Sequence, residues 1–280
     1  MSLLIDTSFL WNETVWNPSM ISTALWLDAA DASTVTTVSG RVSQWNDKSG
    51  NNRNFSQAAS DQRPTYLSVG FSGKPSVRSD GSDSLEAGIT SLGRNVGGLT
   101  AALVGMYPVG ATFNSNASDI FISIGSGDTS TTRFLLGPNS GAPTNRYAIG
   151  GRRLDSDGFT AIASTTDSLA NRGTPWIRIG NRDYSGGVAN HFTNGTQDIT
   201  NFALQGAGNT TDTNSLRTSI FTGVTYTPSN TELSEIVVTH STLTTTDRQK
   251  LEGYLAHKWG LTANLPDTHP YKYQIPTPGV

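Results

Sequence analysis

Apolar and polar residues alternate along most of the chain with a period of two. Gly, Pro, Asn and Asp residues bound the alternating segments. This pattern is typical of antiparallel strands that bury one face and expose the other. The predicted strands are 24–28, 41–45, 76–79, 99–107, 119–125, 133–137, 146–150, 160–164, 176–180, 189–193, 218–226 and 234–240. Because no helices alternate with them, we expect an all-β sandwich of two stacked antiparallel sheets.

One helix is predicted near the C-terminus, at 244–259. Thr244 is its N-cap candidate, and Asp247 stands at the third helical position, as in an acidic variant of the capping box. Gly260 supplies a C-terminal stop. One face of the helix is apolar and contains Leu251, Tyr254, Leu255 and Trp259. We therefore expect this face to pack on an edge or an end of the sandwich.

The composition agrees with a turn-rich β protein. Charged residues make up 15% of the 280 residues, and Ser, Thr, Asn and 29 Gly carry most of the polarity. The net charge is −3 without a run of Lys or Arg, so nucleic acid is not expected as a partner. The chain has no cysteine, which excludes disulfides and thiolate metal sites. No segment approaches the roughly 20 apolar residues of a membrane helix, so membrane insertion is not expected.

The strands and the helix are predicted to form one domain at 23–265, between an N-terminal arm at 1–22 and a C-terminal tail at 266–280. The arm has more apolar surface than a solvated terminus exposes, so we expect it either to attach to a neighbouring subunit of a homo-oligomer or a particle, or to fold back onto its own sandwich. Interfaces favour aromatic anchors, and the candidates in the arm are Phe9, Trp11 and Trp16. The candidate core residues of the domain are Trp26, Trp45, Leu251, Leu255 and Trp259.

Two blocks of sequence resemble one family. The first block comprises 26–31, 42–51, 63–66, 73–78 and 80–83 and includes the string WNDKSGN. The second block comprises 235–238, 247–261 and 265–271 and includes the string EGYLAHKWGL. Together they resemble the laminin G-like, concanavalin A-like domains of phage virion proteins and bacterial surface proteins. Between the blocks, Asn194 and Gly195 are similar to the Asn-Gly hairpin of that family. The resemblance implies a jelly-roll sandwich.

Catalysis is not expected. Enzymes that resemble this fold hydrolyse glycans with carboxylates spaced as Glu-x-Asp-x-Glu or Glu-x-Asp-x-x-Glu, which project from one face of a strand. No Glu of this chain has an Asp two positions later. Glu232 and Glu235 differ by an odd number of positions, so we expect them to point to opposite faces of their strand. The four histidines lack the spacing of a zinc site and are expected to be structural.

Asp-rich turns give the only indication of a metal. Carboxylate oxygens suit calcium, and Asp80, Asp83 and Asp155 lie in predicted loops, where sandwiches display their binding sites. Asp is equally a common turn residue. The family usually has an aromatic residue before the Asp-Gly pair and a second acid two residues beyond it, whereas this chain has Ser79 before the pair and Asp83-Ser84 beyond it. The three aspartates are kept as candidate ligand residues, and calcium is the one cofactor considered.

Three functions remain open. The favoured one is a non-catalytic phage virion protein, either a head-decoration subunit or a tail or fibre module on the particle surface. Its partners would be other virion proteins, and a host-cell glycan is a further candidate ligand. The N-terminus lacks the basic start and the apolar run of a secretion signal, so synthesis in the host cytoplasm is expected. The alternative is a carbohydrate-binding module of a bacterial surface protein, and a glycoside hydrolase is the least favoured.

Overall fold

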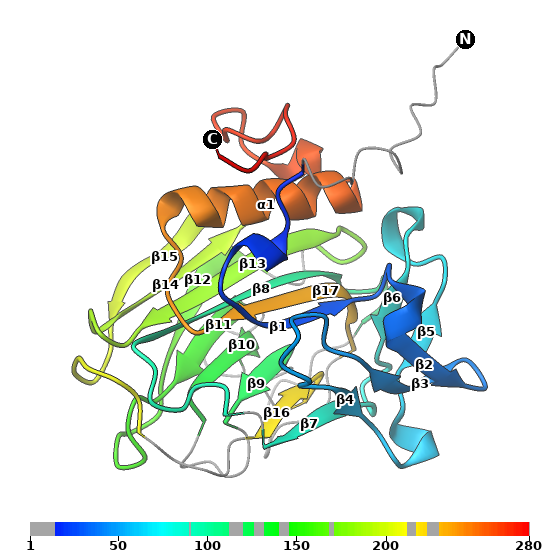
Figure 1. The fold of residues 1–280 in the computed structure, drawn as a ribbon, viewed down its shortest axis with the longest axis horizontal. Helices are drawn as coiled ribbons and strands as arrows, with labels where there is room; N and C mark the ends of the chain where they lie inside the picture. The colour runs from blue at the N-terminus through cyan, green and yellow to red at the C-terminus, as the bar shows by residue number, and fades with distance from the viewer. Residues whose placement is uncertain are drawn as a thin grey trace.

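The computed structural model describes residues 15–89, 91–111, 120–125, 132–139, 146–167, 171–211, 217–222 and 230–279. Within these residues, every paired strand runs antiparallel to its partner. The described part of the chain is mostly β, with its one α-helix near the C-terminus (Figure 1). The predicted all-β class with a late helix is confirmed at this level.

The first of two layers contains strands from distant parts of the chain. In order across the layer they are β1 (Thr23–Asp28), β17 (Glu232–Thr239), β8 (Gly98–Met106), β13 (Trp176–Asp183), β14 (Val188–Thr193) and β15 (Thr196–Ala203). β14 and β15 are joined by the predicted Asn-Gly hairpin. Asn194 and Gly195 have φ angles of 50° and 80°, as a type I′ turn requires.

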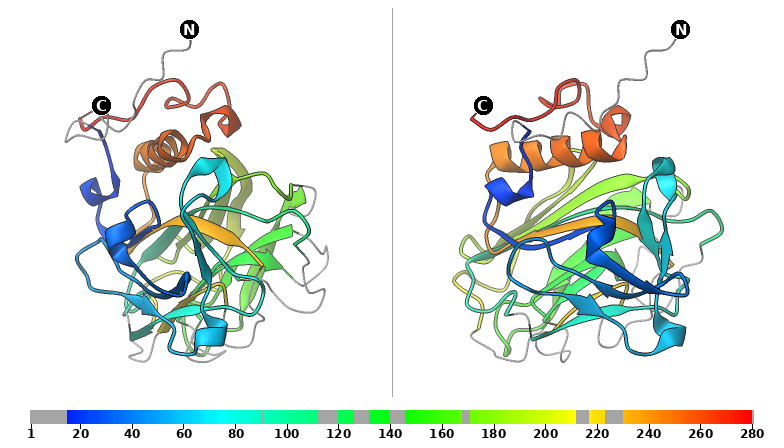
Figure 2. Two further views of the ribbon diagram at one scale, coloured as in Figure 1. Left: turned by 90° about the vertical axis from the view of Figure 1, so that its right-hand side faces the viewer. Right: turned by 45° about the vertical axis from the view of Figure 1, so that its right-hand side comes forward.

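The second layer packs against the first. In order it contains β4 (Phe55–Ser56), β7 (Leu85–Ile89), β16 (Arg217–Ile220), β9 (Ile122–Ile124), β10 (Phe134–Asn139), β11 (Arg146–Gly151) and β12 (Thr160–Asp167). The remaining strands are β2 (Val35–Val38), β3 (Arg41–Trp45), β5 (Thr65–Leu67) and β6 (Ser76–Arg78). Because β6 pairs with β17 and β3 pairs with β4, these strands carry the hydrogen bonding from one layer to the other. The result is a nearly barrel-shaped structure (Figure 2).

The main core lies between the two layers, and a second core lies outside the first layer. β8 shows both, because successive residues of a strand point to opposite faces. Leu99 and Leu103 belong to the core between the layers, whereas Ala102 and Val104 belong to the core under the helix. With both faces covered, nearly all of β8 is buried. Trp45 is fully buried in the core between the layers.

Helix α1 (Thr245–Trp259) covers the outer face of the first layer (Figure 1). Its ends are those predicted: the Thr244 hydroxyl accepts the Asp247 N–H at 3.1 Å, and Gly260 is left-handed. Its predicted apolar face is buried: Leu251, Tyr254, Leu255 and Trp259. Short 3₁₀ helices lie at Pro18–Met20, Ala32–Thr34, Ser60–Gln62, Phe71–Gly73 and Thr262–Asn264. Within the described residues, no helix combines the length and the apolarity needed to span a membrane.

Segments from both ends of the chain pack on α1. Trp16 is 3% exposed, and its ring meets that of Tyr254 edge-on with the centroids 6.2 Å apart. The backbone N–H of Trp16 donates to the carbonyl of Pro276 at 2.9 Å. On the helix itself, a Cβ added at Gly253 would lie 2.4 Å from the Cβ of Tyr271. Trp16 near the N-terminus and the tail at Tyr271 and Pro276 therefore both contact the domain.

Each of the twelve predicted strand ranges overlaps an observed strand, but five strands were not predicted: β2, β4, β5, β7 and β15. β2 and β15 expose most of their residues, so they lack the apolar stripe that reveals a strand. β4 and β5 are only two and three residues long. The strand expected at 218–226 ends earlier, at Ile220, and residues 223–229 lie outside the described part of the chain.

Candidate functional site

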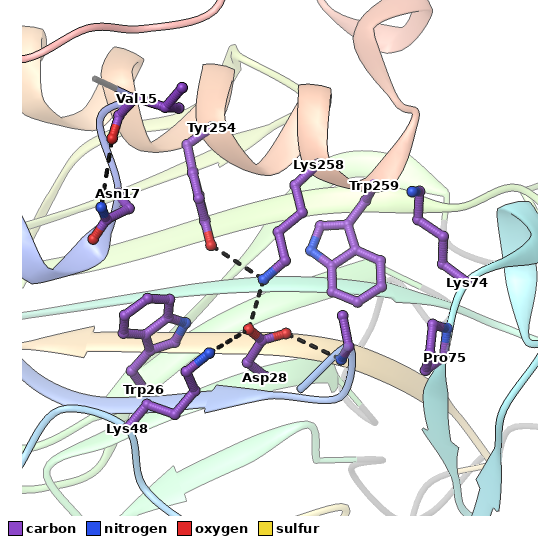
Figure 3. Close-up of a pocket in the computed structure, with 11 residues that line it drawn as sticks. Val15, Asn17, Trp26, Asp28, Lys48, Lys74, Pro75, Tyr254, Lys258 and Trp259 are labelled. Carbon is purple, nitrogen blue, oxygen red and sulfur yellow. Dashed lines mark hydrogen bonds and ion pairs between the residues drawn. The ribbon is translucent and has the colours of Figure 1, made fainter. Parts of the chain in front are cut away.

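A pocket of about 560 Å³ lies beside the C-terminal half of α1 and above the end of β1 (Figure 3). Its lining includes Trp26 and Asp28 from β1, Lys258 and Trp259 from the last turn of α1, and Lys74 from the loop before β6. Asp28 is the last residue of β1, and Lys258 lies above it, with Nζ 2.9 Å from Asp28 Oδ2. The volume lies in the range of small-molecule binding sites.

A fully buried carboxylate, that of Glu235 on β17, lies beneath the pocket. One of its oxygens accepts hydrogen bonds from Trp26 Nε1 at 2.7 Å and from the Tyr254 hydroxyl at 3.0 Å. The other accepts from Trp259 Nε1 at 2.6 Å and lies 2.8 Å from Lys258 Nζ. Burial raises the pKa of Glu235, and the Lys258 ammonium opposes that rise. Both oxygens are engaged by the protein, so Glu235 shapes the pocket without being offered to a ligand.

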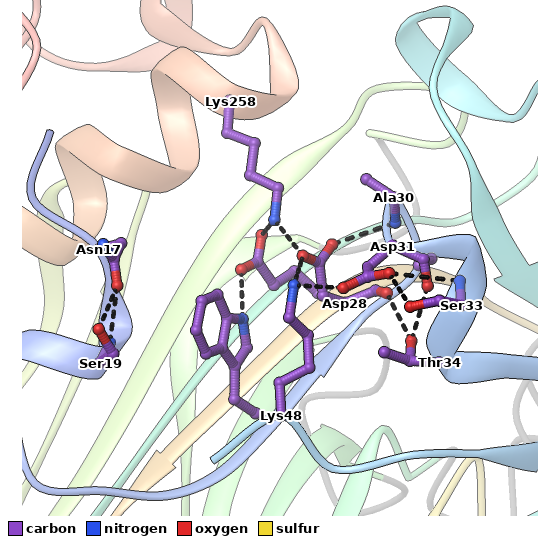
Figure 4. A network of polar contacts seen from close by, with 12 residues as sticks. Asn17, Ser19, Asp28, Ala30, Asp31, Ser33, Thr34, Lys48 and Lys258 are labelled. Carbon is purple, nitrogen blue, oxygen red and sulfur yellow. Dashed lines mark hydrogen bonds and ion pairs between the residues drawn. The ribbon is translucent and has the colours of Figure 1, made fainter. Parts of the chain in front are cut away.

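An ion network connects this carboxylate to the pocket (Figure 4). Asp28 pairs with Glu235 in the β1–β17 ladder, and its Oδ2 lies 2.9 Å from Nζ of both Lys48 and Lys258. Lys48 Nζ is also 2.9 Å from Asp31 Oδ2. Burial by itself would raise the pKa of Asp28, but the two ammonium groups outweigh it and the pKa is lowered. Asp28 therefore stays charged at neutral pH and holds both lysines in place.

Some side chains that line the pocket have N–H donors or an aromatic surface that can contact a ligand. Lys74 has no ion pair or side-chain hydrogen bond with any described residue. Lys48 contacts two carboxylates, which leaves one of its three N–H donors unused. The Trp26 indole is only half-buried, with Lys48 Nζ 4.6 Å from its ring centroid. A ligand in the pocket would therefore meet N–H donors beside an aromatic surface.

The two glutamates of β17 lie on the same face of the strand, so the prediction of opposite faces is wrong. A bulge between Leu233 and Glu235 adds one residue and resets the alternation of side chains. Glu232 is fully buried and accepts hydrogen bonds from the Phe71 N–H at 2.9 Å and from the Ser76 hydroxyl at 2.7 Å. Both carboxylates are structural, and neither is positioned to act on a ligand as an acid or a nucleophile.

The predicted ligand residues lie in two separate turns. Between β6 and β7, Asp83 Oδ2 accepts the backbone N–H of Asp80 at 3.1 Å, and Asp83 Oδ1 lies 3.3 Å from Nη1 of Arg41. Between β11 and β12, Asp155 forms an ion pair with the buried Arg133. Among the described residues, no three acidic or histidine side chains gather around a common point. Arginines and backbone groups engage these carboxylates, and calcium binding by the three aspartates stays a prediction.

The aromatic residues expected in the arm and in the core occupy different environments. Phe9 and Trp11 lie outside the described residues, and Trp16 packs in the second core. Four of the candidate core residues are buried: Trp45, Leu251, Leu255 and Trp259. Trp26 is half-buried because it lines the pocket. Its Nε1–H donates to Glu235.

Spacing along the chain does not identify the charged residues of this pocket, because they become neighbours only in the fold. The two sequence blocks that resemble the family nevertheless contain these charged residues. Lys48 and Lys74 belong to the first block, and Glu235 and Lys258 belong to the second. The two blocks are separated by much of the chain, and they meet at this pocket.

No protein-family model and no curated protein sequence matches the chain. Domain 4 of an extracellular arabinanase from Geobacillus stearothermophilus, in complex with arabinotriose, is similar with a TM-score of 0.57 and 12% identity, over 82% of this chain and 98% of that chain. The binding domain of Paraclostridial Mosquitocidal Protein 1 is similar with a TM-score of 0.57 and 11% identity, over 85% and 53% of the two chains.

A third similar structure concerns botulinum neurotoxin type C, whose cell entry depends on interaction with two ganglioside molecules. Its TM-score is 0.54 at 13% identity, over 84% of this chain and 51% of the toxin chain. The protein thus spans nearly all of the arabinanase domain and about half of each toxin chain. At these identities the likeness shows a shared fold.

Proposed function

We propose that the protein is a non-catalytic glycan-binding domain of the concanavalin A-like jelly-roll type, and that the pocket between β1 and α1 binds a sugar. One observation carries the proposal: the pocket combines the half-buried indole of Trp26 with unused N–H donors of Lys48 and Lys74. Aromatic rings pack against the apolar faces of sugars, and N–H groups bond their oxygens. The fold shared with a domain in complex with arabinotriose supports this assignment.

The bonding of the acids near the pocket supports a non-catalytic role. Most glycoside hydrolases use one carboxyl group that gives a proton and a second carboxylate that faces the sugar. Asp28 is held by two lysines, and both oxygens of Glu235 already accept hydrogen bonds from the protein. Glu232 is buried under the loop before β6. A pocket with these acids is suited to holding a glycan and not to cleaving it.

A glycan array followed by calorimetry on the best-bound glycan tests the sugar pocket. Lys74→Gln removes one positive charge from the pocket, and Arg217→Gln removes one from an exposed pair on β16 as the matched control. We expect Lys74→Gln to weaken binding about tenfold or more, which corresponds to the loss of one good hydrogen bond, and Arg217→Gln to bind as wild type. The proposal fails if no glycan binds or if the two variants behave alike.

We further propose that the domain is displayed on a phage particle, as a head-decoration subunit or as a tail or fibre module, and that it binds glycans of the host surface. The resemblance of both sequence blocks to virion proteins supports this placement. The apolar residues of the arm, among them Phe9 and Trp11, are its candidate contacts with capsid or tail subunits. The alternative, a carbohydrate-binding module of a bacterial surface protein, would use the same pocket.

Truncation tests the attachment role. Deleting residues 1–14 removes the candidate anchors but retains Trp16, which packs on Tyr254. We expect the truncated protein to fold and to bind glycans but no longer to co-purify with particles. Trp16→Ala is the contrasting variant, because it should destabilise the domain itself. Co-purification of the truncated protein with particles at the wild-type level would refute the attachment role, and glycan binding would remain to be judged separately.

A further inference from the structure

A second hollow, of about 360 Å³, lies at the opposite end of α1. It lies over the outer face of β13, β14 and β15, where Figure 1 shows the start of the helix above these strands. Four carboxamide side chains from the three strands line it: Asn181, Asn190, Gln197 and Asn201. The outward face of the sheet is thus lined by neutral amides at the place where the helix leaves it uncovered.

The ladder between β14 and β15 is irregular at this hollow. A register shift between Ala189 and His191 leaves extra residues on β15, and Asn201 there has a φ of 46°. The carbonyl oxygen of the Asn190 side chain accepts the Asn201 N–H at 2.8 Å and Nε2 of Gln197 at 2.9 Å, which holds the bulge together. Bulges re-aim side chains, and left-handed non-glycine residues are concentrated at functional sites.

The carboxamides keep unused hydrogen-bonding groups. Nδ2 of Asn181, Oε1 of Gln197 and the whole side-chain amide of Asn201 have no partner among the described residues. Asn181 nevertheless is only 8% exposed. An amide presents a donor and an acceptor side by side, which matches two adjacent hydroxyl groups of a sugar ring. These groups favour a polyhydroxylated ligand.

The charges around the hollow favour a neutral ligand. Nη1 of Arg248 lies 2.7 Å from each carboxylate oxygen of Glu252, so its charge is compensated. Its guanidinium also covers the Phe192 ring, 3.9 Å from the centroid, and forms a flat wall. Asp183, the acid of the lining, accepts the Gly186 N–H at 2.7 Å. No described cation of the lining is left to attract an anion.

We propose that this hollow is a second sugar site, selective for neutral oligosaccharides and separate from the pocket between β1 and α1. The amides of β13 and β15 would bond the hydroxyl groups, and the wall formed by Arg248 and Phe192 would support the ring. Two sites at opposite ends of one helix allow one domain to engage two sugars of a surface. Such a pair raises the avidity for a dense glycan layer without any additional contact.

Calorimetry on the full-length protein with arabinotriose, cellotriose and maltotriose tests this site with neutral probes. Asn181→Asp and Asn201→Asp keep the side-chain shape but replace an N–H donor by a charged oxygen, and Asp also tolerates the left-handed backbone at 201. Asn201→Gly removes the amide, keeps the left-handed backbone and serves if either variant does not fold. Asn209→Asp is the matched control, because Asn209 is exposed and bonds only Asn95 and Arg153 in another loop.

We expect at least one trisaccharide to bind, and the folded site variants to weaken that binding about tenfold or more. Asn209→Asp should leave it unchanged, and Lys74→Gln, which tests the first pocket, should not remove the binding step that the site variants lose. The proposal is overturned if none of the three sugars binds, if the site variants bind as wild type, or if Lys74→Gln alone abolishes binding. A failure here leaves the first pocket untouched, because Lys74→Gln and the glycan array test that pocket by themselves.

Discussion

The carboxylate of Glu232 should be among the most sensitive side chains in the protein. It is fully buried, and four donors surround it: the Phe71 N–H, the Ser76 hydroxyl and two N–H groups of Arg78. Glu232→Gln keeps one carbonyl oxygen for Phe71 and Ser76. It turns the other oxygen into an NH₂ group that faces the donors of Arg78, so two charge-assisted hydrogen bonds are lost.

The structure sets the expected size of this effect. Each hydrogen bond to a charged group contributes about 1.5–3 kcal/mol, and the removal of one partner from a buried ion pair costs about 3–5 kcal/mol. The Arg78 side chain is 41% exposed, so water can solvate it after the change and reduce the loss. We therefore expect the free energy of unfolding to fall by about 3 kcal/mol.

Urea unfolding followed by tryptophan fluorescence measures the change, with the slope of the transition as a check that the unfolded state is the same. Glu86→Gln is the matched control, because Glu86 also pairs with an arginine, Arg217 at 3.1 Å, but both side chains are more than 40% exposed. Exposed pairs contribute less than about 1 kcal/mol. If Glu232→Gln lowers the free energy of unfolding by no more than Glu86→Gln does, Glu232 does not hold the loop that carries Lys74.

Three further outcomes are expected in the same unfolding assay. Leu255→Ala should lower stability by about 2–5 kcal/mol, because the side chain is fully buried under α1, and a loss below about 0.5 kcal/mol would contradict that packing. Burial raises the pKa of Asp83 to about 6 from 3.8. The folded protein then binds the Asp83 proton more tightly than the unfolded chain, so Asp83 contributes a rise in stability as the pH falls from 7 towards 4, which opposes the fall expected from His191 and His240, whose pKa is lowered by burial. Asp83→Asn should abolish this rise, and an unchanged pH profile would disprove it. Gly253→Ala should cost about 1–3 kcal/mol and open the tail to proteolysis, because the new methyl group overlaps Tyr271; a tail as resistant as in wild type would argue against that contact.

Much of the fold could be predicted because its strands are either half-buried, with an alternating pattern, or buried on both faces, with a mostly apolar run as in β8. Where one face meets a core and the other meets solvent, alternation is visible in the sequence, as at the start of β14, where Ala189 and His191 are buried and Asn190 between them is half-buried. It fails for β15, in which only Ile199 is buried. The helix could be predicted almost to the residue, because Thr244 and Gly260 have capping chemistry that depends only on local sequence. Pairing across the layers, in contrast, depends on contacts between distant segments.

The site was harder to predict than the fold, for two physical reasons. Asp80, Asp83 and Asp155 have the composition of a ligand set, but arginines and backbone N–H groups far along the chain or across the turn take up their carboxylates. The bulge in β17 places Glu232 on the face opposite to the one it would have in a regular strand. No residue type in the local sequence predicts the bulge. Distances in space, and not spacing in sequence, decide which charged groups are available.

The same contacts that fix α1 also shape the pocket beside it. Glu235 is bonded by Trp26 from β1 and by Tyr254 and Trp259 from the helix, so the helix cannot shift without breaking buried hydrogen bonds. Such a shift would leave a buried carboxylate unsatisfied, which costs more than a surface contact can return. The pocket is therefore organised before a ligand arrives, and binding does not have to order the helix. A sugar that binds there should raise the unfolding temperature, and the rise should continue with the logarithm of the sugar concentration above Kd, because the sugar binds the folded chain and not the unfolded one.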